Sequence, residues 1–286
     1  MSERANVTIA DLAAMKQAGR KIAMLTAYDY PTGRLVDEAG VDVVLVGDSL
    51  GMVVLGYDST TPVTMDEMLH HAKATRRGVQ RALLVGDMPF MSFRVSVSDT
   101  VRNAARFVQE ARCDAVKVEW KVGIEDVVKA IVDAGIPVMG HVGLTPQTAQ
   151  AEGGFKVRGK DAESAERIVA QAVSLQEVGC FAVVLECIPS VLAAEITQRL
   201  RVPTIGIGAG ASCDGQVLVL HDVLGLFEKF TPKFVKRYAQ LAPTIRQAAA
   251  AYIDDVRAGR FPEAAHGFTM DPEQWAQARR DMGIDR

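Results

Sequence analysis

The feature that most constrains the fold is a series of eight short apolar runs that alternate with helix-like segments. Most runs are apolar at consecutive positions, as in parallel strands that are covered on both faces. Several helix-like segments end in a glycine, such as Gly40, Gly135 or Gly179, just before the next run. Eight strand–helix alternations predict an α/β fold, a single (β/α)8 TIM-type barrel, with a doubly wound open sheet as the competing layout. The predicted strands are Ile22–Asp29, Val41–Asp48, Ala82–Pro89, Ala115–Trp120, Pro137–Gly143, Phe181–Cys187, Pro203–Gly208 and Val217–Asp222.

The remaining segments predict how the barrel is extended at its two ends. We expect an N-terminal helix at about residues 8–18, with Thr8 and Asp11 as a capping pair, and the barrel at about 21–227. C-terminal helices and a tail are expected at about 228–286, with a helix over Phe234–Val256 and a polar stretch that packs outside or on a neighbouring subunit. Because barrels of this length commonly form one domain, we expect a single domain over residues 1–286.

Composition excludes several classes of protein. Lys+Arg 32 against Asp+Glu 35 leaves a net charge of −3, without the basic excess of a nucleic-acid groove. The four cysteines form no CxxC pair and are expected to be reduced core thiols. No apolar run is long enough to span a bilayer and no signal peptide begins the chain, so we expect a cytoplasmic protein without membrane or nucleic-acid partners.

Polar side chains close five successive predicted strands. In a (β/α)8 barrel the carboxyl ends of the strands carry the active site. A strand-end aspartate alone is more often a turn residue or a helix cap, but carboxylates gathered at one mouth repel one another, and a bound cation relieves that repulsion. The residues are Asp48, Asp87, Lys117, Glu119, His141 and Glu186.

Three of these side chains suit a hard metal ion. Asp48, Asp87 and Glu119 offer oxygen ligands without thiolate or imidazole, which favours Mg²⁺ or Mn²⁺ over Zn²⁺. Lys117 shares a strand face with Glu119 and is either a salt-bridge partner or a group that binds an anionic substrate. His141 has two interpretations, a hydrogen-bonded core histidine or a site residue.

A glycine-rich run, Gly206–Ala211, formally matches a dinucleotide-binding pattern. That site needs a long helix directly after the run, whereas the strand-like segment Val217–His221 follows almost at once. We therefore expect close backbone approach at the barrel mouth instead.

Several longer motifs occur in one order along most of the chain, from about Thr26 to Phe268. They are Thr26–Asp29, Val46–Met52, Asp58–Thr60, Val85–Phe90, Gly143–Gln147 and Ile205–Gly210, followed by Lys233–Lys236 and Phe261-Pro262 with His266. With these motifs the sequence resembles the ketopantoate hydroxymethyltransferase (3-methyl-2-oxobutanoate hydroxymethyltransferase) family of pantothenate biosynthesis.

The resemblance implies a barrel enzyme that transfers a hydroxymethyl group from methylenetetrahydrofolate to ketoisovalerate. It implies one Mg²⁺ per subunit at Asp48, Asp87 and Glu119, with Glu186 as the proton acceptor. It further implies a homo-oligomer, commonly a decamer. The substrate contacts that we expect are Asp48, Ser49, Asp87, Lys117 and His141.

The sequence departs from the family directly after Glu119, where Trp120 and Lys121 replace two usual glycines. Because side chains alternate along a strand, Trp120 should face away from the barrel interior, and we expect it near the rim. Two alternatives remain open at this point. One is a related barrel enzyme of the phosphoenolpyruvate mutase/isocitrate lyase type that acts on another 2-oxo acid through a Mg²⁺-enolate; the other is a non-catalytic binding or assembly protein.

Overall fold

The computed structural model describes residues 6–151 and 153–284, and all eight predicted strands are present in it. The strands are parallel and close into one barrel in chain order, with β1 paired to both β2 and β8. This confirms the (β/α)8 barrel and excludes the open sheet. The strands are β1 Ile22–Thr26, β2 Val43–Val46, β3 Leu83–Asp87, β4 Ala115–Glu119, β5 Val138–Gly143, β6 Ala182–Glu186, β7 Thr204–Ile207 and β8 Gly215–Leu218.

The last strand differs from its predicted range of Val217–Asp222. It begins earlier, at Gly215, because residues from Gly215 onward pair with β1 from Ile22. The side-chain oxygen of Thr26 then accepts a hydrogen bond from the backbone N–H of Leu220 at 3.0 Å. There the chain turns into the short helix α10, Leu220–Val223, so its polar residues lie on a helix rather than on a strand.

Strand alternation divides the core of this unit into two layers. On β2, Val43 and Leu45 face the barrel interior, where Leu12 and Met15 of the N-terminal helix also pack. The alternate residues of the strands, such as Val44, pack outward against the helices. The apolar runs are therefore continuous because both faces of each strand are buried.

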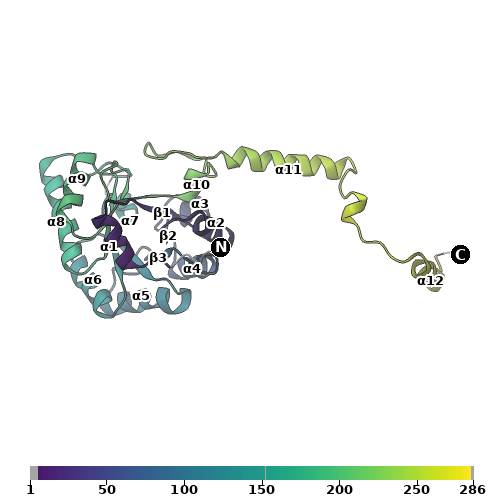
Figure 1. Cartoon of the computed structure of the whole chain (residues 1–286), viewed down its shortest axis with the longest axis horizontal. Helices are drawn as coiled ribbons and strands as arrows, with labels where there is room; N and C mark the ends of the chain where they lie inside the picture. Colours follow the sequence, from purple (N-terminus) through teal and green to yellow (C-terminus); the bar gives the residue numbers. More distant parts are fainter. Residues whose placement is uncertain (1–5, 152, 285–286) are drawn as a thin grey trace. The chain divides into compact units, whose positions relative to one another are not determined.

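Helices surround the barrel, as Figure 1 shows for α4, α5, α6 and α8. The predicted capping pair is confirmed, since Thr8 accepts from the backbone of Asp11 while the Asp11 side chain accepts from Thr8. Gly40 ends its helix with φ at 94°, a left-handed conformation that glycine adopts without strain. The helices are α1 Ile9–Gln17, α2 Tyr30–Ala39, α3 Leu50–Val53, α4 Met65–Gly78, α5 Val97–Ala111, α6 Ile124–Asp133, α7 Pro146–Ala149, α8 Ala162–Glu177 and α9 Ser190–Arg199.

The chain divides into two compact units, Met1–Tyr238 with the barrel and Ala239–Arg286. The second unit contains α11 Leu241–Arg257, a 3₁₀ turn at Ala264–His266 and α12 Pro272–Asp281. The helix predicted from Phe234 begins only at Leu241, and the Phe234 side chain instead packs on Leu144 and Cys187 in the barrel unit. The expectation of one domain, and that of the tail packing on a neighbouring subunit, stay predictions.

All four cysteines are free and buried, as predicted. Within residues 6–151 and 153–284, no helix is both long and apolar enough to cross a membrane.

Candidate active site

The predicted site residues continue the inward-facing series of their strands. On β4, Ala115 faces the interior, so Lys117 and Glu119 on the same face come next toward the mouth. Strand register then sets the neighbours, because Asp87 pairs with Lys117 and Glu119 pairs with His141. The structure therefore brings these side chains from separate strands together above the apolar interior.

A buried ion pair joins two of these strands. Lys117 Nζ donates to Asp87 Oδ1 at 2.7 Å. The other carboxylate oxygen of Asp87 accepts the backbone N–H of Asp48 at 3.2 Å. Asp48, Asp87, Lys117 and Glu119 are each at most 5% exposed, so little water screens their charges.

Gln147 connects the carboxylates across the mouth. Its side-chain amide donates to Asp48 Oδ2 and to the backbone oxygen of Met88, both at 2.9 Å. Its backbone N–H donates to Glu119 Oε2 at 3.2 Å. We assigned no role to Gln147 from the sequence, although it closes the Gly143–Gln147 motif and directly follows Pro146 at the start of α7.

Burial and mutual repulsion perturb the acidic groups. Burial and then the charge of Asp87 raise the pKa of Asp48 to about 7, against the opposing effects of Lys117 and Gln147. Burial also raises the pKa of Glu119 well above its ordinary value, while Lys117 opposes the shift. Burial alone would lower the pKa of Lys117, but the surrounding carboxylates, Asp87 first, raise it above its ordinary value. Lys117 therefore stays charged and offsets part of the negative charge.

His141 lies between two carboxylates. Its Nε2 is 3.2 Å from Glu186 Oε2 and its Nδ1 is 3.7 Å from Glu119 Oε1, yet neither nitrogen meets hydrogen-bond geometry with any described residue. Burial, followed by the charge of Lys117, lowers the pKa of His141. The imidazole is thus neutral at pH 7. The Glu186 side chain is 15% exposed and reaches the pocket.

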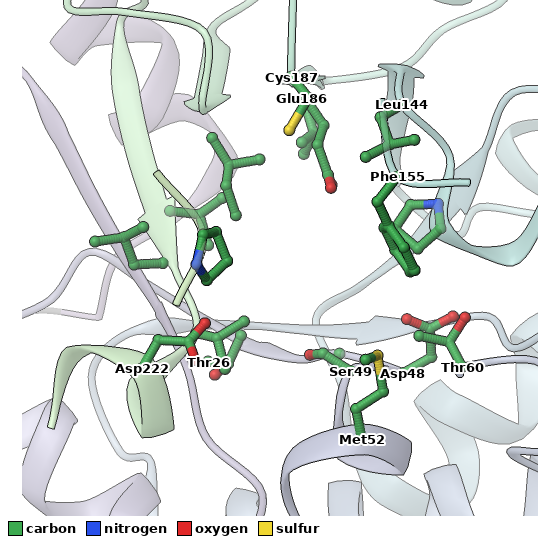
Figure 2. Close-up of a pocket in the computed structure, with 18 of the residues that line it drawn as sticks. Thr26, Asp48, Ser49, Met52, Thr60, Leu144, Phe155, Glu186, Cys187 and Asp222 are labelled. Atoms are coloured by element: carbon green, nitrogen blue, oxygen red, sulfur yellow. The ribbon is translucent and has the colours of Figure 1, made fainter. Parts of the chain in front are cut away.

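A pocket of about 460 Å³ opens over this cluster, a volume typical of small-molecule sites. Figure 2 shows Glu186 and Asp48 pointing into it from different strand ends, with Ser49 beside Asp48. The Ser49 hydroxyl lies 2.9 Å from the hydroxyl of Tyr28, which positions it. Most of the other lining side chains are apolar, among them Phe155 and Leu144.

The donors present fit a hard divalent cation. Glu119 Oε1 is buried without a hydrogen-bond partner, which leaves an acceptor for a cation. No three His, Cys, Asp or Glu side chains of the described residues are already spaced to enclose a metal ion. Mg²⁺ usually keeps several waters and takes one or two carboxylates directly, so a fully enclosing cage is not required.

Trp120 does face away from the barrel interior, as predicted. It is half-buried against the outer core layer and lines a second cavity together with Lys121 and Thr145. The glycine-rich run after Gly206 is followed by β8 rather than by a helix, so the dinucleotide pattern has no structural counterpart.

The comparisons with known proteins agree over nearly the whole chain. The sequence pattern of the family described as ketopantoate hydroxymethyltransferase matches residues 6–264. A 3-methyl-2-oxobutanoate hydroxymethyltransferase of Desulfotalea psychrophila is 61% identical over 92% of this chain and 94% of its own length. One of Carboxydothermus hydrogenoformans is 56% identical over 93% of this chain and 97% of its own length.

Solved structures share the barrel at low identity. Phosphoenolpyruvate phosphomutase of Streptomyces platensis subsp. rosaceus aligns with a TM-score of 0.60 at 16% identity, over 97% of this chain and 96% of its own. A 2,3-dimethylmalate lyase, described as a member of the PEP mutase/isocitrate lyase superfamily, aligns with a TM-score of 0.56 at 14% identity, over 97% of each chain. At such identity these structures support the fold alone, so the activity follows from the family match and the relatives above. The chain is therefore an enzyme that belongs to the ketopantoate hydroxymethyltransferase family.

Proposed function

We propose that the enzyme transfers a hydroxymethyl group from methylenetetrahydrofolate to ketoisovalerate, and that one Mg²⁺ per subunit binds at Asp48, Asp87 and Glu119. The observation that carries the proposal is the unpartnered Glu119 Oε1 in a buried carboxylate cluster beside a small-molecule pocket. A cation at this position balances charges that Lys117 offsets only in part.

The other residues of the site are assigned to binding ketoisovalerate and to proton transfer. We assign the contacts with ketoisovalerate to Asp48, Ser49, Asp87, Lys117 and His141, since all five line the pocket. Lys117 supplies positive charge where the anionic 2-oxo acid binds. Mg²⁺, when bound, acts as a Lewis acid on the ketone oxygen and makes the neighbouring carbon more acidic.

Glu186 is the group that we assign to proton abstraction. Its carboxylate accepts the proton from the carbon next to the ketone, and the neutral imidazole of His141 lies 3.2 Å from it. In the net reaction, that carbon forms a bond to the one-carbon unit while both C–N bonds of that unit to the folate break. One water supplies the new hydroxyl group, and the abstracted proton and the second hydrogen of the water end on N5 and N10 of the departing tetrahydrofolate. The apolar pocket walls limit the access of other water molecules.

A deuterium-exchange assay separates proton abstraction from transfer. In D₂O with Mg²⁺ and no folate, the wild type should exchange the proton next to the ketone of ketoisovalerate. Glu186→Gln keeps the size of the side chain and lacks its basicity, so exchange should fall on the order of 100-fold or more. Glu166→Gln, an exposed site on α8, is the matched control and should exchange normally. If Glu186→Gln exchanges at the wild-type rate, another group is the base, and His141 is the first to test.

Product formation tests the complete reaction. Ketoisovalerate, methylenetetrahydrofolate and Mg²⁺ should give ketopantoate, identified by mass spectrometry, and omission of the folate should abolish it. A folate-independent product from a 2-oxo acid would favour the lyase-type alternative, and no reaction or exchange at all would favour a binding protein.

We also propose that the enzyme is a homo-oligomer. Helix α11 supports this, because its large apolar side chains Ile245, Tyr252 and Val256 are not buried by the unit of residues 239–284 to which the helix belongs. Light scattering on the purified enzyme tests it, and a monomeric mass would reject it.

A further inference from the structure

One wall of the pocket carries a carboxylate that the mechanism above does not use. Asp222 lies on α10, beyond the end of β8, and lines the pocket although it is only 8% exposed. Figure 2 shows it next to Thr26, on the opposite side of the view from Phe155 and Leu144 and away from Asp48 and Ser49. The Asp222 side chain therefore lines a part of the pocket that lies away from Asp48 and Ser49.

The carboxylate of Asp222 has no donor of its own in the described part of the chain. No N–H or O–H group of residues 6–151 or 153–284 hydrogen-bonds to it, and it forms no ion pair there. Burial raises the pKa of Asp222, and the charge of Arg237 opposes that shift only in part. The Arg237 guanidinium donates its hydrogen bonds elsewhere, to Thr231 Oγ1 at 2.6 Å and to the Phe227 oxygen at 3.3 Å. The Asp222 oxygens are not sealed from the pocket, so a ligand bound there can supply the missing donors.

The surroundings of Asp222 suit a flat aromatic ligand. Phe227, Phe230 and Phe234 line the same pocket, and the rings of Phe227 and Phe230 pack edge to face at 5.4 Å. Arg237 fixes the segment that carries Phe227 and Phe230, because its guanidinium donates to the Phe227 oxygen and to Thr231 Oγ1. A mainly apolar site with a few well-placed polar groups is the usual design for orienting a ring system, and Thr26 and Lys233 line this pocket together with Asp222.

The two substrates differ in whether they can donate hydrogen bonds to Asp222. Ketoisovalerate carries a carboxylate and a ketone, which have only acceptors, so the negatively charged Asp222 has nothing to accept from it. The pterin ring of a folate carries an N–H at N3 beside the 2-amino group, two parallel donors on one edge. A carboxylate with two oxygens can accept both in the paired geometry that it also forms with guanidinium.

We propose that Asp222 anchors the pterin ring of the folate co-substrate by accepting hydrogen bonds from N3–H and the 2-amino group. The proposal rests on the proposed function, since it names the wall of the same pocket that holds the one-carbon donor. Anchored at this edge, the ring leaves its opposite side, which carries the one-carbon unit, free to face the residues that hold ketoisovalerate.

Equilibrium binding of tetrahydrofolate tests this without any turnover. Isothermal titration calorimetry with tetrahydrofolate and with its 2-desamino-2-methyl analogue should show that the wild type discriminates against the analogue on the order of 10- to 100-fold. Asp222→Asn replaces one acceptor oxygen by a donor, so it should bind tetrahydrofolate on the order of 10- to 100-fold more weakly and lose most of the discrimination. Asp126→Asn, at an exposed position in α6, should match the wild type.

Each outcome decides the proposal. Equal wild-type affinity for both ligands would overturn it without any variant, so a poorly folded Asp222→Asn cannot hide the answer. Undiminished discrimination in Asp222→Asn, or no binding of tetrahydrofolate by the wild type, would also overturn it. Failure of the proposed function is a separate result, because the exchange and product assays with the wild type detect it independently of folate affinity.

Discussion

Replacing Asp222 by asparagine should stabilise the enzyme, and by an amount that depends on pH. Burial is the larger influence on this carboxyl and raises its pKa from 3.8 to about 6, against the charge of Arg237. Because the folded state holds the proton more tightly than the unfolded state, ionisation costs stability. The cost is absent below about pH 4, grows as the pH rises, and is complete above about pH 6. An asparagine side chain does not ionise, so the variant avoids the cost.

The pKa difference sets the size of the effect. At about 1.36 kcal/mol for each pH unit, raising the pKa from 3.8 to about 6 corresponds to about 3 kcal/mol at pH 8. At pH 5 the same linkage gives about 1.6 kcal/mol. The stability of Asp222→Asn relative to the wild type should therefore rise by about 1.4 kcal/mol between pH 5 and pH 8, which is about 2–3 °C in melting temperature for a chain of 286 residues.

Thermal melting of both proteins without ligand, from pH 5 to pH 8, measures this difference. His221 remains in both proteins, so its titration largely cancels when the two curves are subtracted. Asp126→Asn, which makes the same replacement at an exposed position, is the control for the substitution itself. A melting-temperature difference for Asp222→Asn that stays flat or narrows toward pH 8 would refute the argument that burial makes this carboxylate costly.

Three further predictions concern the carboxylate cluster. Lys117→Met removes the ammonium group that lies 2.7 Å from the buried Asp87 carboxylate. The free energy of unfolding, measured by urea denaturation in metal-free buffer, should therefore fall by about 3–5 kcal/mol. A loss below about 1 kcal/mol contradicts this prediction. Gln147→Leu removes the side-chain amide that hydrogen-bonds to Asp48, so calorimetry should show Mg²⁺ binding weakened about 10- to 100-fold. An unchanged Mg²⁺ affinity would show that Gln147 does not position Asp48. Excess chelator should abolish product formation, as should Asp87→Ala, and full activity in chelator would reject the metal.

Much of the fold follows from local patterns that the sequence states directly. The eight runs predicted parallel strands because both faces of each strand are buried, and the structure places Val43 and Val44 in different core layers for that reason. Strand alternation also indicated that Lys117 and Glu119 share a face, and that Trp120 faces the other way. The site residues could be grouped because parallel strands end at one mouth.

Other features depend on which strand ends become neighbours. Gln147 and Asp48 are 99 residues apart, and their hydrogen bond exists only because the barrel is closed and staggered. The pairing of Lys117 with Asp87 likewise depends on the register between β3 and β4. Such contacts join segments with no local signal in common, so no pattern of spacing along the chain reports them.

Asp222 shows where the sequence stops being sufficient. We expected it to end the last strand, whereas pairing with β1 stops β8 at Leu218 and the chain turns into α10. Residue alternation determined which side chains can face the barrel mouth, because that depends only on the strand itself. Only the closure of the barrel decided which of these side chains contact one another, which remain without a hydrogen-bond partner and which part of the pocket each one lines. These contacts join segments that are far apart in the sequence.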